Sequence, residues 1–292
     1  MTIIRQGLIS LGLTVVPVSN VTLDPGILET GRRSAGDNYA TQQTVFGARP
    51  AVTCTMPLGT ALDTVGLTCL RMTAFTLSLI KIDSSTGLDT AGAGNVQFTL
   101  ATSALAYAVV SDFQARQGAL ATATVQIWLI SADGTTHPLS KGAGARLSLS
   151  AQPTLHTLGP VDLNGSELPA VAGVSGSLQH EAAARTTDGD LYPTEYAWRA
   201  SMPMLSIDHS DPDALLTALG LTGSNISAAT KVAFLARGSD NLISSTEKSI
   251  TIGDGHISPR QESGGVGQTA SQGFDILAAS SDGTTHPWTL GA

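Results

Sequence analysis

The sequence predicts a mainly β protein made of two similar, consecutive β domains, each a sandwich or barrel with one short flanking helix. Its clearest sign is a stretch that occurs twice with one change, SADGTTHP at residues 131–138 and SSDGTTHP at residues 280–287. The segment before each copy alternates apolar and polar residues with a period of two, as a half-buried strand requires. Short β-branched runs separated by Gly, Ser and Asp fill most of the remaining chain, which favours many short strands.

Length and order support a duplication. A chain of 292 residues suits one large domain or two smaller ones. ALDTVGLT at residues 61–68 resembles LLTALGLT at residues 215–222, and both indicate a short helix that ends at a glycine. The predicted domains are residues 1–148 and 149–292. Chance similarity in a chain rich in Thr, Ser, Ala and Gly is the alternative.

A third pair of segments agrees with this order. VTLDPGILE at residues 21–29 parallels VDLNGSELP at residues 161–169, each a strand end followed by a turn. All three pairs follow one another in the same sequence in both halves. The duplicated segments therefore predict one strand order used twice.

Three further segments are predicted to be strands. Residues 73–82 alternate cleanly, and residues 231–240 occupy the same place after the second predicted helix. Residues 96–110 indicate one strand or two. The first twenty residues indicate an ordered strand or arm rather than a signal peptide, because Gly12 and Thr14 interrupt the apolar run and no small-residue cleavage site follows.

The repeated stretch itself predicts a hairpin. Asp-Gly is the favoured pair for a two-residue type I′ turn, in which both positions need a positive φ. Pro138 and Pro287 cannot donate to a ladder, so each marks an edge or the end of pairing. His137 and His286 are the only loop residues without an evident structural role. A packing or interface role is favoured for them, since no nucleophile and orienting acid accompany them.

The sequence predicts no enzyme, with no catalytic, cofactor-binding or metal-binding residue and no cofactor. None of the six histidines has a helical metal spacing. IDHSDPD at residues 207–213 offers oxygens for calcium but lacks the EF-hand spacing, and indicates a loop entering a helix. Cys54 and Cys69 fit no zinc pattern and are expected to be free, buried thiols. The three tryptophans are expected to be core or interface anchors: Trp128, Trp198 and Trp288.

The composition favours self-assembly. Charged residues make up 13% of the chain, against about 25% in typical domains. A surface poor in charge is easier to bury against another subunit. The net charge of −8 and the lack of a basic cluster argue against nonspecific nucleic-acid binding, although like charge could keep DNA from adhering to a channel wall. No apolar run approaches the ~20 residues of a membrane span.

Together these features resemble the tail tube proteins of long-tailed bacteriophages. The resemblance rests on the two DGTTHP stretches, on the helical segments ending at Gly66 and Gly220, and on the alternating strands after them. It implies domains in rings of six around a β-lined channel for DNA. A chain with two fused domains would then assemble as a trimer that imitates the hexamer.

The resemblance also implies a place and partners: the virion tail, after synthesis in the host bacterial cytoplasm, in contact with other tail proteins. One departure is the Gly- and Ser-rich segment at residues 261–273, which leaves open whether both copies contribute equally to a channel. The alternative function is a two-domain adhesin or tail-tip module that binds a host surface.

Overall fold

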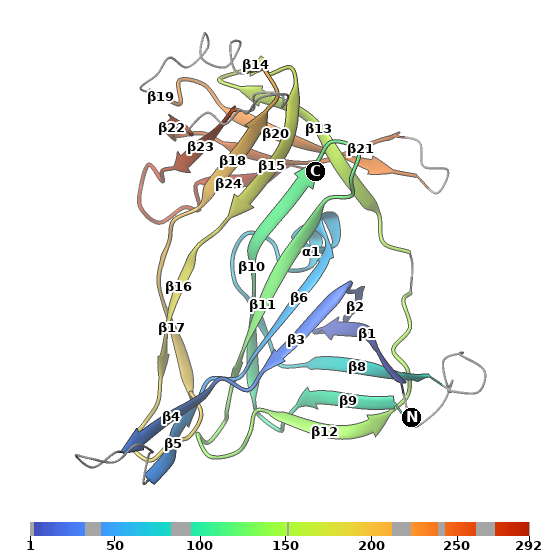
Figure 1. The fold of residues 1–292 in the computed structure, drawn as a ribbon, viewed down its shortest axis with the longest axis vertical. Helices are drawn as coiled ribbons and strands as arrows, with labels where there is room; N and C mark the ends of the chain where they lie inside the picture. The colour runs from blue at the N-terminus through green and yellow to red at the C-terminus, as the bar shows by residue number, and fades with distance from the viewer. Residues whose placement is uncertain are drawn as a thin grey trace.

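The structure is a computed structural model, and the protein is mainly β, as predicted (Figure 1). It describes residues 3–32, 42–82, 95–150, 152–211, 223–238, 243–260 and 272–291.

We call the first half of the described chain repeat 1. Its elements are β1 (Ile3–Leu11), β2 (Thr14–Pro17), β3 (Asn20–Asp24), β4 (Ile27–Arg32), β5 (Gln42–Ala48), β6 (Ala51–Pro57), α1 (Leu58–Thr64), β7 (Leu70–Met72), β8 (Phe75–Ile82), β9 (Asn95–Leu100), β10 (Leu105–Arg116), β11 (Thr122–Ile130) and β12 (Leu139–Gly144).

We call the second half repeat 2. Its elements are β13 (Leu155–Leu163), β14 (Ser166–Glu167), β15 (Val171–Ser177), β16 (His180–Arg185), β17 (Glu195–Ser201), β18 (Met204–His209), β19 (Ser224–Asn225), β20 (Thr230–Arg237), β21 (Ile243–Ile252), β22 (Gly255–Pro259), β23 (Gln272–Ala278) and β24 (Trp288–Gly291).

The two repeats have the same strand order. One sheet of repeat 1 runs β12-β9-β8-β1-β2, and one sheet of repeat 2 runs β24-β21-β20-β13-β14. The other sheet runs β3-β6-β11-β10 in repeat 1 and β15-β18-β23-β22 in repeat 2. Even the short strands correspond, since β7 pairs with β10 and β19 pairs with β22.

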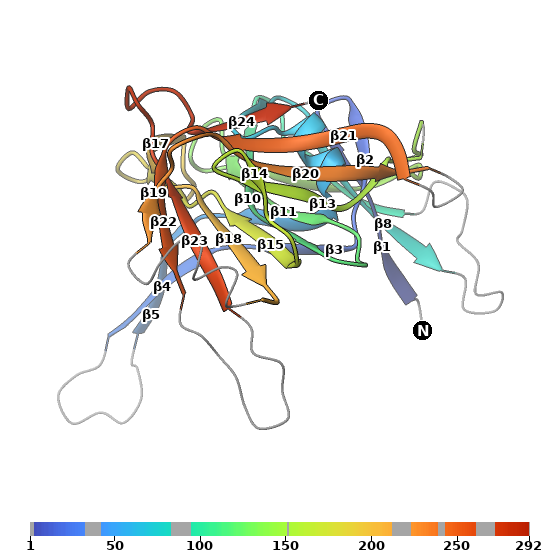
Figure 2. The ribbon, with the colours of Figure 1, turned by 90° about the horizontal axis from the view of Figure 1, so that it is seen from above.

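Each repeat also extends a hairpin from between corresponding strands. Arm 1 is the β4–β5 hairpin, which follows β3, and arm 2 is the β16–β17 hairpin, which follows β15. Arm 2 runs down beside repeat 1 toward the base of arm 1 (Figure 1). Seen from above, arm 1 projects away from the body of the molecule (Figure 2).

The repeats are joined edge to edge. β10 pairs antiparallel with β15, residues 112–116 against residues 173–177, so that one sheet runs through both halves. We call this the joined sheet. The division of the chain at residue 148 stays a prediction: the residue lies in the connection between β12 and β13, while the joined sheet crosses from one half to the other.

The core is continuous across the junction. Alternate residues of the joined sheet point inward and pack against the smaller sheet of each repeat, forming one buried apolar cluster. Phe113 on β10 lies edge-on to Phe234 on β20, with ring centroids 5.8 Å apart, and to Trp288 on β24, at 6.0 Å. An aromatic residue of repeat 1 therefore packs in the core of repeat 2.

Most strand predictions agree with this fold. The segments at 73–82 and 231–240 contain β8 and β20, which are equivalent strands, although residues 239–240 lie outside the described part. Residues 96–110 fall on two strands, β9 and β10. The first helix begins three residues earlier than predicted, and the second lies outside the described residues. Gly66 follows α1 at φ +78, as expected of a helix stop.

The third pair of landmarks was wrong. Residues 21–29 cover β3 and the start of β4, whereas residues 161–169 cover the end of β13 and β14. The counterparts of β13 and β14 in repeat 1 are β1 and β2. Turn residues after a strand end occur at several places in such a chain, so the local likeness did not identify equivalent strands.

Candidate assembly interface

The repeated stretch is a crossover loop and not the predicted hairpin. We call residues 131–138 loop 1 and residues 280–287 loop 2. Loop 1 leads from β11 in the joined sheet to β12 in the smaller sheet of repeat 1, and loop 2 leads likewise from β23 to β24. Gly134 and Gly283 have φ of +72 and +69, but neither aspartate before them has a positive φ, so no type I′ turn forms.

The side chain of the loop aspartate holds each loop in shape. Asp133 Oδ1 accepts hydrogen bonds from the backbone N–H of Thr135 and Thr136 at 3.0 and 2.7 Å, and Oδ2 accepts the Thr136 hydroxyl at 2.7 Å. These bonds hold the pKa of Asp133 well below its usual range, the bonds from Thr136 first. Asp282 makes the same three bonds in loop 2, with the same direction of pKa shift.

The two loop histidines have a structural role that the sequence did not reveal. Nδ1 of His137 accepts the backbone N–H of Leu139 at 3.0 Å, and Nδ1 of His286 accepts that of Trp288 at 3.1 Å. Each imidazole thus satisfies the first N–H of the strand that follows. Asp, Thr and His are therefore used in both loops to build the same backbone shape.

Arm 2 docks on loop 1. The carbonyl oxygen of Gly134 accepts the N–H groups of Leu191 and Tyr192, both at 2.8 Å. The N–H of Ser131 donates to the carbonyl of Pro193 at 3.0 Å. The Tyr192 ring lies edge-on to His137, with ring centroids 5.2 Å apart. Backbone hydrogen bonds, donated by both partners, thus hold the tip of arm 2 on loop 1.

Arm 2 also contacts repeat 1 beyond loop 1. Ala48 at the base of arm 1 donates its N–H to the carbonyl of Leu191 at 2.7 Å. Trp128, on the exposed face of β11, contacts two aromatic rings of β17, Tyr196 and Trp198, with centroids 5.5 and 5.1 Å apart. Two of the three tryptophans expected to be core or interface anchors therefore meet between the repeats.

Loop 2 has the same shape, but no arm among the described residues docks on it. Gly134 and Ser131 are buried under arm 2, whereas Gly283 is exposed and Ser280 is half-buried. A Cβ added at Gly134 would meet the carboxyl group of Asp190, while one added at Gly283 would meet no atom within 4 Å. The two loops therefore differ in what covers them and not in their own structure.

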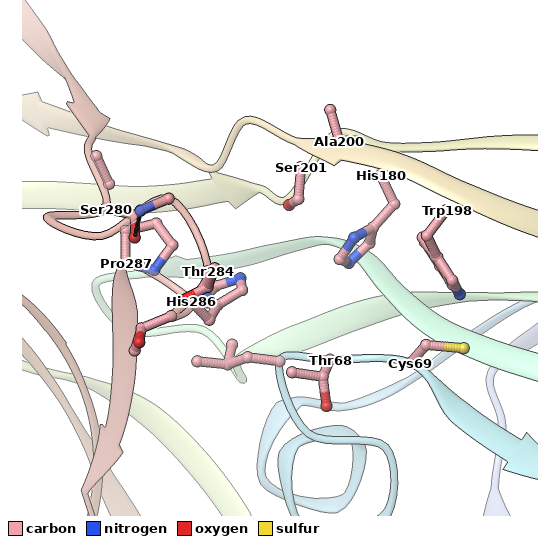
Figure 3. A pocket seen from close by; sticks show the side chains of 14 residues that line it. Thr68, Cys69, His180, Trp198, Ala200, Ser201, Ser280, Thr284, His286 and Pro287 are labelled. Atoms are coloured by element: carbon pink, nitrogen blue, oxygen red, sulfur yellow. Dashed lines mark hydrogen bonds between the residues drawn. The ribbon is translucent and has the colours of Figure 1, made fainter.

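A hollow of about 620 Å³ lies beside loop 2 (Figure 3). Loop 2 forms one wall, the base of arm 2 another, and residues 67–69 after α1 the floor. Nε2 of His180 and Nε2 of His286 are buried there without a hydrogen-bond partner among the described residues. Burial lowers the pKa of His180 to about 4, and repulsion from a protonated His286 adds to this effect. Burial also lowers the pKa of His286.

Alanine at the two loop glycines should have unequal effects. Each substitution puts a side chain at a positive φ, which costs roughly 1–2 kcal/mol. Gly134→Ala should lower the free energy of unfolding by more than Gly283→Ala, because only the first also displaces Asp190. Urea unfolding of the two variants measures the difference. Equal losses would mean that arm 2 does not hold loop 1 in solution.

Among the described residues, the remaining candidates do not gather into a cluster. Both cysteines are free as expected, but only Cys54 is fully buried and Cys69 is half-buried beside the hollow. Burial raises the pKa of Cys54 to about 12 and that of Cys69 to about 11. Within the described ranges, no three His, Cys, Asp or Glu residues are placed to hold a metal ion.

The segment at 207–213 was predicted to be a loop, but residues 207–209 are the end of strand β18 in the joined sheet. Asp208 on β18 pairs with Arg260 at 2.7 Å, and His209 is buried. Residues 212 and 213 lie outside the described part of the chain. No helix in the described part is both long and apolar enough to cross a membrane.

Sequence reasoning selected the two loops but missed what binds one of them. Residues 190–193, which make the dock, match no catalytic, metal or turn pattern that marks a function. Comparison with known proteins adds no name for the site: no protein-family model matches the chain, and no curated protein sequence gives a significant match.

Proposed function

We propose that this protein is a virion structural protein, the building block of a bacteriophage tail tube. Three chains, each supplying two repeats, form a pseudo-sixfold ring, and stacked rings enclose a channel for DNA. Assembly occurs in the host cytoplasm, and the finished tube contacts other tail proteins. The observation that carries the proposal is the joined sheet, in which one repeat is added to the next through unlike edges.

The junction has a direction. β10 of repeat 1 meets β15 of repeat 2, and β15 is the counterpart of β3, not of β10. Contacts between unlike surfaces repeat indefinitely and produce either closed rings or open filaments. A third repeat can therefore be added by the same contact, with β3 of another chain in the place that β15 occupies.

Both surfaces needed for that addition lie at the ends of the joined sheet. β3 is the last strand at one end, where it pairs with β6 alone among the described strands. β22 with β19 lies at the other end, as β10 with β7 does in repeat 1. The part of repeat 2 that corresponds to residues 112–116 begins after Arg260, outside the described residues. The last strand of a sheet is a template for further pairing, which supports assembly.

The outer face of the joined sheet suits a channel wall. It carries short hydroxyl and amide side chains at Thr22, Thr53, Thr55, Gln114, Thr124, Gln126, Ser175 and Ser206. Such a face offers few cations to hold phosphates, so DNA would pass without adhering. Its charges are of both signs, Asp112, Arg116, Asp208 and Arg260, and Asp208 pairs with Arg260. The acidic bias expected of an inner wall therefore stays a prediction.

Negative-stain electron microscopy of the purified protein, with its mass measured by light scattering, tests the proposal. Annular particles of three chains, or filaments of stacked rings, are the expected result. A chain that remains monomeric at every concentration, or a compact trimer without a central channel, would instead favour the adhesin or tail-tip module.

A further inference from the structure

The tip of arm 2 has a second copy in the sequence. Residues 189–194 read GDLYPT, and residues 36–41 read GDNYAT. Arms 1 and 2 can be aligned without a gap, from Ile27 with His180 to Ala48 with Ser201, and this alignment places the two segments opposite each other. Residues 36–41 lie outside the described part, so only their sequence enters the argument. The chain thus contains both loops twice and the docking segment twice.

Among the described residues, one of the two pairs is made within the chain. Arm 2 occupies loop 1 through Asp190, Leu191, Tyr192 and Pro193. Loop 2 keeps the same acceptor and donor, the Gly283 carbonyl and the Ser280 N–H, and neither has a partner among the described residues. The hollow beside loop 2 is where the tip of an arm would lie, because Ala200 and Ser201 in its wall correspond to Gly47 and Ala48.

Apolar side chains are also exposed beside loop 2 and on arm 1. Trp128 corresponds to Leu277, and Trp198 corresponds to Val45. The Trp128–Trp198 contact is made within the chain, whereas Leu277 and Val45 are 51% and 47% exposed. Exposed apolar residues at the positions where the equivalent pair is buried mark an interface.

We infer that loop 2 and the hollow beside it bind arm 1 of a second copy of this chain. In that contact, the Gly283 carbonyl and the Ser280 N–H would bind the GDNYAT segment of the other chain, as Gly134 and Ser131 bind residues 191–193 within one chain. Val45 of the other chain would cover Leu277. The inference rests on the proposed self-assembly and adds the recognition element. The repeated DGTTHP loop is the receptor, and the GDxYxT segment is its ligand.

Paired cysteines test the contact directly. Asp190 touches the position of a Cβ on Gly134, so cysteines at these two sites lie within disulfide reach. The inferred contact would bring residue 37 of one chain equally close to Gly283 of another. Both pairs are placed in a Cys69→Ser background, since Cys69 lines the hollow, while Cys54 is buried with a raised pKa and does not react.

The two pairs should give different products under mild oxidation. Asp37→Cys with Gly283→Cys should yield a reducible ladder of covalent multimers, while the matched control, Asp190→Cys with Gly134→Cys, should close within one chain and give no ladder. Either cysteine of the first pair alone should give no ladder beyond background. Tyr39→Ala should weaken assembly at least tenfold with an unchanged melting temperature, whereas Tyr192→Ala should lower the melting temperature.

The outcomes separate this inference from the proposed function. Rings that form without a ladder, and that Tyr39→Ala does not weaken, would overturn the arm 1 contact and leave the tube. A ladder from a protein that microscopy shows as open strings without a channel would support the contact and overturn the tube. A protein that stays monomeric and gives no ladder would overturn both.

Discussion

Phe113→Ala should lower the free energy of unfolding by about 3–5 kcal/mol, the usual cost of removing a fully buried phenylalanine. The ring is 1% exposed and packs against Phe234 and Trp288. Its loss would leave a cavity where the two repeats share their core. Urea unfolding followed by tryptophan fluorescence measures the loss, with linear extrapolation to water.

Phe98→Ala is the matched control, because Phe98 on β9 is half-buried and packs at the margin of the core of repeat 1. It should cost less and leave a single transition. If Phe113→Ala costs no more than Phe98→Ala, the repeats do not share a core in solution.

Leu23→Pro should abolish ring formation, while Leu23→Ala should preserve it. The carbonyl of Gly26, just after β3, accepts the N–H of Arg49, just before β6. Backbone groups alternate in direction along a strand, so those of Asp24 and Thr22 also face β6. The N–H of Leu23 then points away from β6, toward the side where another chain would pair in the proposed ring. Proline removes this N–H donor. Alanine also lacks the leucine side chain but keeps the N–H donor.

Microscopy and sedimentation of the two variants provide the measurement. Circular dichroism checks that each variant keeps its β structure. Rings of normal size from Leu23→Pro would show that β3 is not the edge through which chains join.

The sequence predicted those strands in which apolar and polar residues alternate. β8, β20 and β11 are half-buried strands with a clear period of two, and all three were expected. The hairpin was wrong because Asp-Gly has two uses. In these loops Asp133 bonds forward to the N–H groups of Thr135 and Thr136, which the dipeptide alone does not indicate.

The interface was only half visible in the sequence. The loops were found because seven of their eight residues match. The docking segments share only Gly, Asp, Tyr and Thr, which are common in turns, so the match gains meaning only once Tyr192 is seen against His137. Most hydrogen bonds between arm 2 and loop 1 join backbone groups. Every residue type has a backbone, so these bonds cannot be recognised from the sequence.

The connection between β12 and β13 sets how strong each contact has to be. Because it tethers repeat 2 to repeat 1, arm 2 meets loop 1 at an effective concentration on the order of millimolar, whatever the amount of protein in the cell. That intramolecular contact can be weak and still form completely. Arm 1 has no such tether to the loop it is inferred to bind, so its affinity alone sets the threshold concentration. Selection for assembly at the right moment of synthesis would then act on GDNYAT and loop 2, while GDLYPT and loop 1 could vary more widely.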